Sequence, residues 1–214
     1  MLFIHPILPF RRLCPHALWR GDRAARCVYL TFDDGPIPEV TPWVLDTLDR
    51  YGIKATFFVV GDNVRRHPDL YRQLLLRGHA VGNHTCHHLR GRGSASDAYH
   101  DDVLHCQHLM RQHQPAGAPG TVTTLFRPPH GFVALGQQRR LEHEGMQLVQ
   151  WDIVTRDYNP RNTPRRILAV VRRYVRPGSI ITFHDSLRSE PRLRQALPAV
   201  IEHLQHEGYE FRTL

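Results

Sequence analysis

The sequence has no long hydrophobic run, no repeat and only four cysteines, and each of these features excludes a class of protein. No stretch of eighteen or more apolar residues occurs in the 214 positions, so no transmembrane helix is predicted. The four cysteines lack the paired spacing of a zinc ribbon or a disulfide framework. The content of 41% hydrophobic and 22% charged residues is typical of a soluble globular protein.

The N-terminal segment also lacks the order of a secretion signal. Residues 1–10 are apolar, but the basic pair Arg11 and Arg12 follows this stretch instead of preceding it. We therefore expect a cytoplasmic location, with an association with the cell envelope through residues 1–10 as the alternative. The predicted organisation is an N-terminal extension over 1–25 and one folded domain over 26–214.

Acidic residues are in the minority. Lys and Arg total 28 against 20 Asp and Glu, which gives a net charge of +8 with histidine neutral. This charge suits an anionic partner, such as a wall polymer or a lipid headgroup, and also suits a solvated arginine-rich surface. The arginines are scattered and no nucleic-acid-binding motif accompanies them, so a nucleic-acid partner is not expected.

Short runs rich in Val, Ile, Phe and Thr alternate with stretches of helical periodicity. The predicted strands are Cys27–Asp34, Lys54–Gly61, His79–Asn83, Thr124–Arg127, Gln147–Ile153, Ser179–His184 and Tyr209–Arg212. The predicted helices are Val40–Arg50, Pro68–Arg77, Ala95–Gln112, Leu135–Glu144, Pro164–Val175 and Pro191–Glu207. The alternation predicts a parallel α/β fold, a distorted (β/α) barrel of about seven strands, with an open doubly wound sheet as the alternative.

The most informative stretch is Thr31–Pro36, where a buried strand ends on the adjacent carboxylates of Asp33 and Asp34. Adjacent residues on a strand point to opposite faces, so one carboxylate could bind a metal while the other reaches a water molecule. Two anions this close repel each other unless a cation lies between them. An ordinary turn is the alternative, because Asp and Gly are common in turns.

Polar motifs also follow four other predicted strands. They are His84–His88, Arg127–Gly131, Trp151–Tyr158 and Thr182–Asp185. The carboxyl ends of parallel strands meet at one edge of a sheet, so we expect these motifs to form one site. Carboxylates, imidazoles and a guanidinium together indicate metal-assisted chemistry rather than core packing.

His84 and His88 are four residues apart, a spacing that would place both imidazoles on one side of a helical turn around one cation. The pair alone is weak evidence, because sixteen histidines in 214 positions give about one such pair by chance. His105 and His108 are expected to be surface residues of a helix. His87 is expected to point away from the pair.

The five motifs, in this order, resemble those of the NodB-homology polysaccharide deacetylases, carbohydrate esterase family 4. The match runs from Thr31 to His184 within a domain of roughly Arg26–Leu214. The resemblance implies a distorted (β/α) barrel, in agreement with the strand count. It also implies a divalent metal bound by one Asp and two His, and the hydrolysis of N-acetyl or O-acetyl groups of glycans.

The resemblance implies that Asp34, His84 and His88 bind the metal. Three protein ligands leave a position open for water and for the substrate carbonyl, as in catalytic sites. Zinc fits an Asp-His-His set, and cobalt, nickel or manganese could also serve.

The resemblance further implies that Asp33 is the general base, oriented by Arg127, and that His184 is the general acid. The backbone N–H of His130 would help to stabilise the oxyanion. Asp157 is retained from the motif that precedes the acid. The expected partner is an N-acetylated glycan or amino sugar.

The sequence departs from the family pattern in two motifs. His130 replaces a common tyrosine, a mild change if only the backbone N–H acts there. The motif that usually reads Asp-x-x-Asp-Trp is Val154–Tyr158 here. Val154 replaces the acid that would tune His184, so either Asp152 or another group takes that role or His184 works with less support. Trp151 is expected either to line the sugar site or to belong to the core, as is Phe183.

The sequence thus predicts a metal-dependent hydrolase that removes N-acetyl groups from a glycan such as peptidoglycan or a chitin-type oligosaccharide. The first alternative is a deformylase, or another hydrolase of non-peptide C–N amide bonds, on the same fold. The second is a glycan-binding module with a decayed site, which the presence of both a candidate base and a candidate acid disfavours. The acyl group, the glycan and the oligomeric state are left open.

Overall fold

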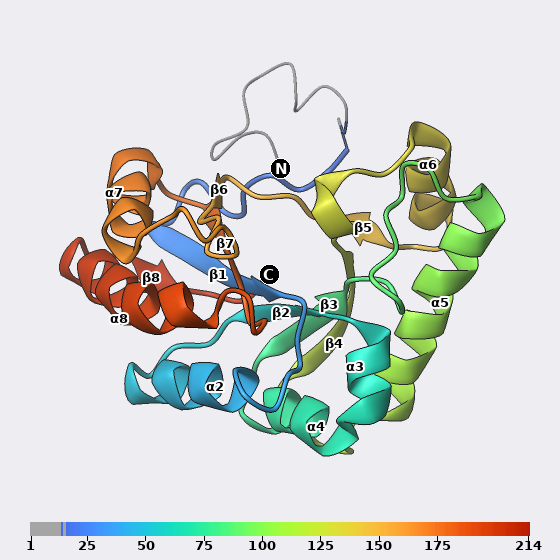
Figure 1. The fold of residues 1–214 in the computed structure, drawn as a ribbon, viewed down its shortest axis with the longest axis horizontal. Helices are drawn as coiled ribbons and strands as arrows, with labels where there is room; N and C mark the ends of the chain where they lie inside the picture. Colours follow the sequence, from blue (N-terminus) through green and yellow to red (C-terminus); the bar gives the residue numbers. More distant parts are fainter. Residues whose placement is uncertain (1–13, 15) are drawn as a thin grey trace.

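The structure, a computed structural model, describes Cys14 and residues 16–214. One parallel sheet has the strand order β5-β4-β3-β2-β1-β7-β6, and β8 pairs with β1. The sheet curls into an incomplete barrel with helices around its outer side (Figure 1). The strands are β1 Cys27–Asp33, β2 Thr56–Val59, β3 Ala80–Asn83, β4 Thr121–Phe126, β5 Gln147–Leu148, β6 Ile153–Val154, β7 Ser179–His184 and β8 Glu210–Phe211.

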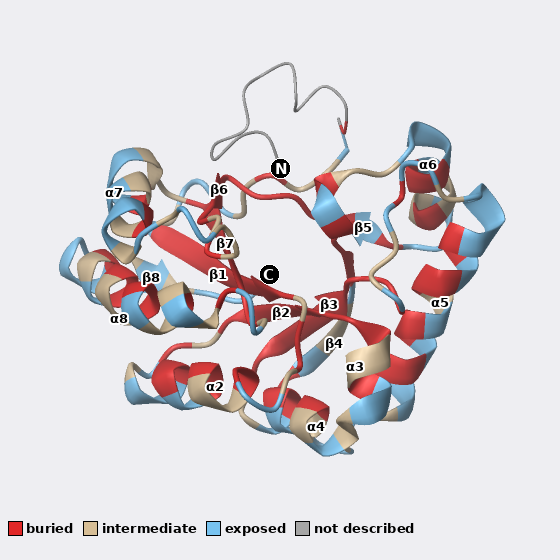
Figure 2. Ribbon diagram, viewed as in Figure 1, coloured by how far each residue is buried: buried red, intermediate tan, exposed pale blue. Residues whose placement is uncertain are grey.

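The helices alternate with the strands, as the sequence predicts. They are α2 Thr41–Arg50, α3 Gly61–Arg66, α4 Pro68–Leu76, α5 Ser96–Gln112, α6 Leu135–His143, α7 Pro164–Tyr174 and α8 Glu190–His206, with a short 3₁₀ turn at Pro129–Gly131. The buried residues lie on the sheet and on the helix faces turned toward it (Figure 2). Within the described residues, no helix combines the length and the apolar character that a membrane span requires.

The core forms around β1, whose seven residues are all buried. Phe32 of β1 stacks on Phe57 of β2 at 5.0 Å and on Phe183 of β7 at 6.1 Å between ring centroids. Burial on both faces of the sheet explains why these strands are mostly apolar along their whole length. This packing fixes the strands whose carboxyl ends carry the predicted site.

The predicted strand Gln147–Ile153 is wrong in one respect, because it divides into β5 and β6 at the two ends of the sheet. Residues 149–152 cross the gap between them. Leu18 forms a bridge with Val149 and Arg20 forms one with Ser179, so residues before Arg26 also pair with the sheet. The division into 1–25 and 26–214 stays a prediction, and residues 1–10, on which the predicted location depends, lie outside the described residues.

Proline and glycine residues mark the ends of several helices. Pro68 and Pro164 begin α4 and α7, where the missing N–H of proline costs no hydrogen bond. Gly78 and Gly145 follow helices with φ values of 79° and 77°, a region that favours glycine. The sequence analysis missed α3, a six-residue helix that begins at Gly61.

Candidate active site

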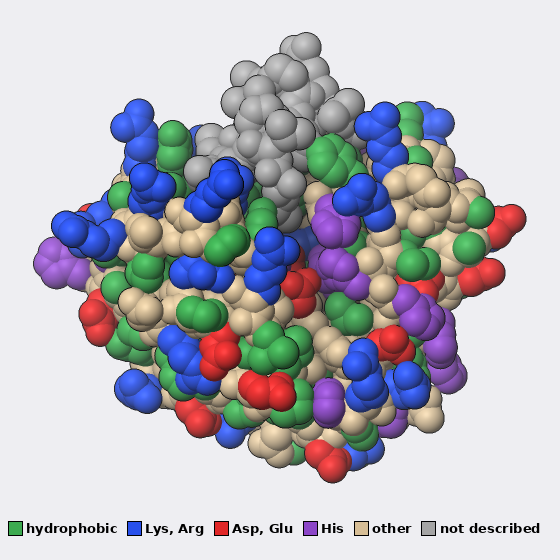
Figure 3. All heavy atoms as spheres, in the orientation of Figure 1, with side chains coloured by type: hydrophobic (Ala, Val, Ile, Leu, Met, Phe, Trp, Pro, Cys, Tyr) green, Lys and Arg blue, Asp and Glu red, His purple; other side chains and the backbone are tan. Residues whose placement is uncertain are grey.

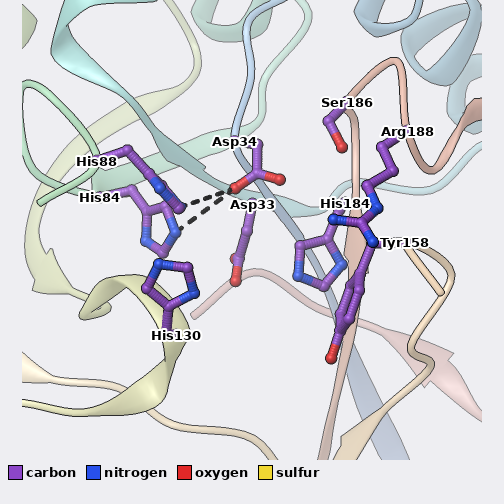
Figure 4. A pocket seen from close by; sticks show the side chains of 9 residues that line it. All are labelled: Asp33, Asp34, His84, His88, His130, Tyr158, His184, Ser186 and Arg188. Carbon is purple, nitrogen blue, oxygen red and sulfur yellow. Dashed lines mark ion pairs between the residues drawn. The ribbon is translucent and has the colours of Figure 1, made fainter. Parts of the chain in front are cut away.

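A cavity of about 400 Å³ opens at the carboxyl ends of the strands. Histidine and carboxylate side chains meet at the centre of this face of the molecule (Figure 3). Nine residues line the cavity (Figure 4): Asp33, Asp34, His84, His88, His130, Tyr158, His184, Ser186 and Arg188. Six of them are predicted site residues, and the other two predicted residues, Arg127 and Asp157, lie behind the lining and bond to it.

Asp33 and Asp34 both line this cavity, so the expectation that they point to opposite faces is wrong. β1 ends at Asp33, and Asp34 turns out of the strand with a φ of 85°. Asn63 of α3 fixes that turn, because its Nδ2 donates to the Asp34 carbonyl at 2.7 Å. Asp33 is the register partner of His184 on β7, so the candidate base and acid are neighbours across the sheet.

Arg127 holds the carboxylate of Asp33. Its Nη1 donates to Asp33 Oδ1 at 2.6 Å and to Thr31 Oγ1 at 2.8 Å, and its Nη2 donates to the carbonyl of Gln150 at 3.0 Å. The side chain is fully buried, with its guanidinium 4.1 Å from the centre of the Phe58 ring. A buried cation requires such a partner, and this contact is the one that the predicted role of Arg127 needs.

The predicted metal ligands come together. One ligand atom each of Asp34, His84 and His88 lies within 4.8 Å of the other two. Asp34 Oδ1 is 3.7 Å from Nε2 of His84 and 3.4 Å from Nε2 of His88 (Figure 4). Nδ1 of His84 donates to the Arg127 carbonyl at 2.7 Å, a bond that leaves Nε2 free to face the metal position.

The expected helical turn between the two histidines is wrong. Residues 84–88 form an irregular loop in which Thr85 and His88 have φ values of 66° and 54°. Asn83 Oδ1 accepts from the N–H of Thr85, and Thr85 Oγ1 accepts from the N–H of Leu89. These local bonds replace helical ones, and they still bring both imidazoles to the same carboxylate.

The protonation states of these ligands suit a cation. Burial lowers the pKa of His84 to about 4, so its imidazole is neutral at pH 7. Burial would raise the pKa of Asp34, but the hydrogen bond from His88 and the nearby imidazoles lower it below its usual range. A carboxylate and neutral imidazole nitrogens are the forms that bind metal, so the residues fit a divalent ion with one position left open.

His184 is held by Asp157. Its Nδ1 donates to Asp157 Oδ1 at 2.8 Å, and its backbone N–H donates to Asp157 Oδ2 at 2.8 Å. Burial alone would lower the pKa of His184, but the Asp157 carboxylate raises it to about 9. The imidazole is therefore protonated at neutral pH, as a general acid must be.

The expectation that Asp152 replaces a lost acid at Val154 is wrong. Val154 is buried in β6, and Asp152 faces the other way, where it accepts from Arg176 at 2.8 Å and from Ser179 Oγ at 2.8 Å. The partner of the acid histidine is Asp157, three residues beyond β6. His184 therefore keeps a carboxylate partner although valine replaces the family's acid at position 154.

His130 lies in the 3₁₀ turn with a φ of 61°, and its ring is 5.1 Å from the ring of His88. The next residue, Gly131, packs so closely on Trp151 that an added Cβ would lie 2.2 Å from the indole. Trp151 and Phe183 are core residues, with 1% and 0% exposure, and neither lines the cavity.

Sequence reasoning did not select Tyr158, Ser186 and Arg188, which also line the cavity. The ring of Tyr158 meets the ring of His184 edge-on at 4.8 Å. Its position after Asp157, where the family has tryptophan, is the signal that could have identified it. Ser186 and Arg188 belong to the turn after β7, and the sequence has no comparable signal for them.

The histidines expected outside the site lie outside it. His87 points to α5, where Nδ1 bonds the carboxylate of Asp102, and its side chain is 53% exposed. His105 and His108 are exposed on α5. A second set of donor atoms within 4.8 Å of one another, from Asp62, Cys86 and His87, lies on this outer side of the same loop.

Comparisons with known proteins agree with this geometry. Residues 20–149 match the family model described as polysaccharide deacetylase. A peptidoglycan-N-acetylglucosamine deacetylase of Bacillus cereus is 31% identical over 93% of this chain and 91% of its own length. A chitooligosaccharide deacetylase of Bradyrhizobium is 34% identical over 88% of this chain and 89% of its own length.

Among solved structures, the Bc1960 peptidoglycan N-acetylglucosamine deacetylase is similar, with a TM-score of 0.88 and 28% identity. The alignment covers 97% of this chain and 95% of that one. The curled parallel sheet, the Asp-His-His set and the extent of these matches lead to one conclusion. The chain belongs to the polysaccharide deacetylase family, carbohydrate esterase family 4.

Proposed function

We propose that this protein hydrolyses the N-acetyl group of an N-acetylated amino-sugar glycan. The observation that carries the proposal is the placement of a carboxylate and a protonated imidazole beside the Asp-His-His set in one cavity (Figure 4). Asp33 and His184 are register partners, so both can reach one scissile bond. A module that only bound glycans would need neither group.

Asp34, His84 and His88 would hold a divalent cation, for which zinc fits best and cobalt, nickel or manganese would also serve. Such a cation supplies a Lewis acid that polarises the acyl carbonyl and lowers the pKa of the attacking water. The carbonyl of Arg127 keeps Nε2 of His84 aimed at that position.

Asp33 acts as the general base and takes a proton from the water that attacks the acyl carbon. Arg127 keeps this carboxylate in place through its bond of 2.6 Å. The backbone N–H of His130, a residue that lines the cavity, donates to the oxygen of the tetrahedral intermediate.

His184 acts as the general acid. When the intermediate collapses, the C–N bond breaks, the imidazolium gives its proton to the leaving amine, and acetate is released. The raised pKa of about 9 keeps that proton available at neutral pH. Asp157 holds Nδ1–H of the imidazolium, so the proton given to the amine is the one on Nε2.

The test is the release of acetate from N-acetylglucosamine oligomers and from peptidoglycan fragments. Metal-free protein, zinc-loaded protein and Asp33→Asn would be compared. Zinc-dependent release that the variant lacks supports the proposal. Release of formate from N-formyl substrates, without acetate release, would favour a deformylase, and stoichiometric glycan binding without any hydrolysis would favour a binding module.

The cytoplasmic location predicted from the order of residues 1–12 stays a proposal. It is checked by fractionating cells that express the full chain and measuring the protein in the cytoplasmic, membrane and extracellular fractions. Recovery outside the cytoplasmic fraction would favour the envelope association instead.

A further inference from the structure

The arginines are scattered along the chain, but most of the net positive charge falls in one segment beside the site, because that segment has no acidic residues. Residues 158–184 contain six arginines and no Asp or Glu, which gives +6 of the net charge of +8, and the rest of the chain carries +2. Lys and Arg side chains cover the molecular surface over α7, next to the central cavity (Figure 3). The catalytic residues account for none of these charges.

Several of these arginines surround a second cavity of about 460 Å³ between α7 and the loop before it. We call it the arginine groove, and its lining residues are Arg156, Asn159, Arg161, Asn162, Arg166, Ala169, Val170, Arg173 and Tyr174. Five of them belong to α7 at spacings of three, one, three and one residues, which places them on one face of the helix. Two guanidiniums of the helix therefore face two of the loop.

The groove is formed in advance by the fold. Asn162 Nδ2 donates to the carbonyl of Thr155 at 2.8 Å, and Asn159 Oδ1 accepts from the N–H of Arg161 at 3.0 Å. Thr163 caps the N-terminus of α7, because its side chain accepts a hydrogen bond from the N–H of Arg166. These bonds fix the loop backbone, so a ligand would not have to order it.

The guanidiniums of the groove have no acidic partner. Within the part of the chain that the structure describes, no carboxylate oxygen lies within 4.0 Å of Arg156, Arg161, Arg166 or Arg173, whereas nearby Arg176 pairs with Asp152 at 2.8 Å. Like charges around one cavity repel each other until an anion enters. Guanidinium groups bind the planar or tetrahedral oxygens of carboxylates and phosphates in pairs.

The groove and the active-site cavity are lined by neighbouring residues of one loop. Tyr158 lines the active-site cavity, while Arg156 and Asn159, on either side of it in the chain, line the groove. A ligand could thus place its acyl amino sugar in one cavity and an anionic group in the other. Four guanidiniums suit more than one negative charge, which favours a diphosphate over a single carboxylate.

We propose that the arginine groove binds a diphosphate group carried by the substrate, so that the substrate is an N-acetylated amino sugar linked to a diphosphate. This inference rests on the proposed deacetylase function. The diphosphate could belong to a nucleotide-linked sugar or to a lipid-linked sugar, and both present the same oxygens to the groove.

Binding of inorganic pyrophosphate, measured by titration calorimetry, tests the groove without any turnover. The groove variant is Arg161→Gln/Arg166→Gln/Arg173→Gln, and the control variant is Arg50→Gln/Arg111→Gln/Arg139→Gln. All six residues are exposed, so both variants should fold and both lose three charges. We expect the groove variant to bind pyrophosphate at least about tenfold more weakly, and the control to stay within about twofold. Equal binding by the wild type and both variants would overturn the proposal.

Turnover then tests whether the groove serves the active site. Acetate release would be compared for UDP-N-acetylglucosamine, a polyprenyl-diphosphate-linked N-acetylglucosamine and a neutral N-acetylglucosamine oligomer. We expect the groove variant to raise KM about tenfold for the diphosphate substrate that the protein accepts, and to leave KM of the oligomer unchanged. Whichever of the two diphosphate substrates releases acetate shows whether the natural substrate is a nucleotide-linked or a lipid-linked sugar.

The same data separate the two proposals. An unchanged ratio of KM values between charged and neutral substrates would refute the role of the groove and leave the deacetylase intact. Pyrophosphate binding that depends on the groove, without acetate release from any of the three substrates, would refute the deacetylase and keep the anion site.

Discussion

In the active-site cavity the candidate base and acid each bond to a residue of opposite charge. The arginines of the arginine groove, which residues 156–159 connect to that cavity, have no carboxylate partner among the described residues. Asp33 bonds Arg127 and His184 bonds Asp157, at 2.6 and 2.8 Å. Paired groups are fixed in position and in protonation state, as chemistry requires. Unpaired guanidiniums instead retain their capacity to bind, which indicates that the first cavity is built for reaction and the second for recognition.

The largest expected effect is on the base. Asp33→Asn should lower turnover by about a thousandfold, because the amide cannot take the proton of the water, and should leave the metal content unchanged. His84→Ala should instead lose the metal. Acetate release and elemental analysis of the same samples check both. Asp69→Asn, at a residue 92% exposed on α4, is the matched control; substantial turnover by Asp33→Asn would exclude it as the base.

The comparison also predicts that substitutions in the two cavities differ in their effect on the free energy of unfolding. Arg127→Gln should lower the free energy of unfolding by about 3–5 kcal/mol, because it leaves the buried Asp33 carboxylate unpaired. Arg166→Gln/Arg173→Gln in the groove should change it by less than about 0.5 kcal/mol. Urea denaturation measures both. Adding Asp33→Asn to Arg127→Gln should recover part of the loss, and a fully additive loss would contradict the assigned pairing.

A smaller effect is expected on the pH dependence. In the wild type, the pKa of His184 near 9 predicts that kcat falls as pH rises above about 9, where the acid loses its proton. In Asp157→Asn the strongest of the interactions that raise this pKa is lost, and only the smaller effects of Asp34 and Asp33 still oppose burial, so the fall should move to lower pH. At pH 7 we expect a loss of about ten- to a hundredfold. Both proteins must carry the same metal, and an identical alkaline limb would show that Asp157 does not set this pKa.

The smallest effect is on salt dependence. Raising the ionic strength from low values to about 0.5 M should weaken pyrophosphate binding several-fold, because exposed charges are screened. The kcat for a neutral oligomer should change little, since the charged pairs of the active-site cavity are buried. Salt titrations of both quantities check this, and an equal loss in both would contradict the division between the cavities.

The sequence predicted the site better than it predicted the local backbone around it. Polar motifs at the ends of β1, β3, β4 and β7 had to meet, because parallel strands place their carboxyl ends at one edge. The turn of Asp34 out of β1 could not be predicted, because it depends on Asn63, a residue of the unpredicted helix α3. The path of residues 84–88 likewise depends on side-chain bonds to the loop.

The partner of His184 shows the same limit. Asp152 and Asp157 are equally acidic in the sequence, and the choice between them depends on the register of β6 against β7, where Val154 lies beside Thr182. That register places Asp157 beside His184 and leaves Asp152 to Arg176 and Ser179. The arginine groove could not be predicted from the sequence either, because its residues come from a loop and from one face of α7.

The left-handed backbone at His130 separates two properties that are usually coupled. Its backbone lies in a turn with a φ of 61°, next to Gly131, which packs closely on Trp151, while its side chain is exposed and lines the cavity. Replacing the side chain therefore need not disturb the donor. Position 130 is a place where new substrate preferences can evolve, or be selected in a library, without a loss of catalytic competence.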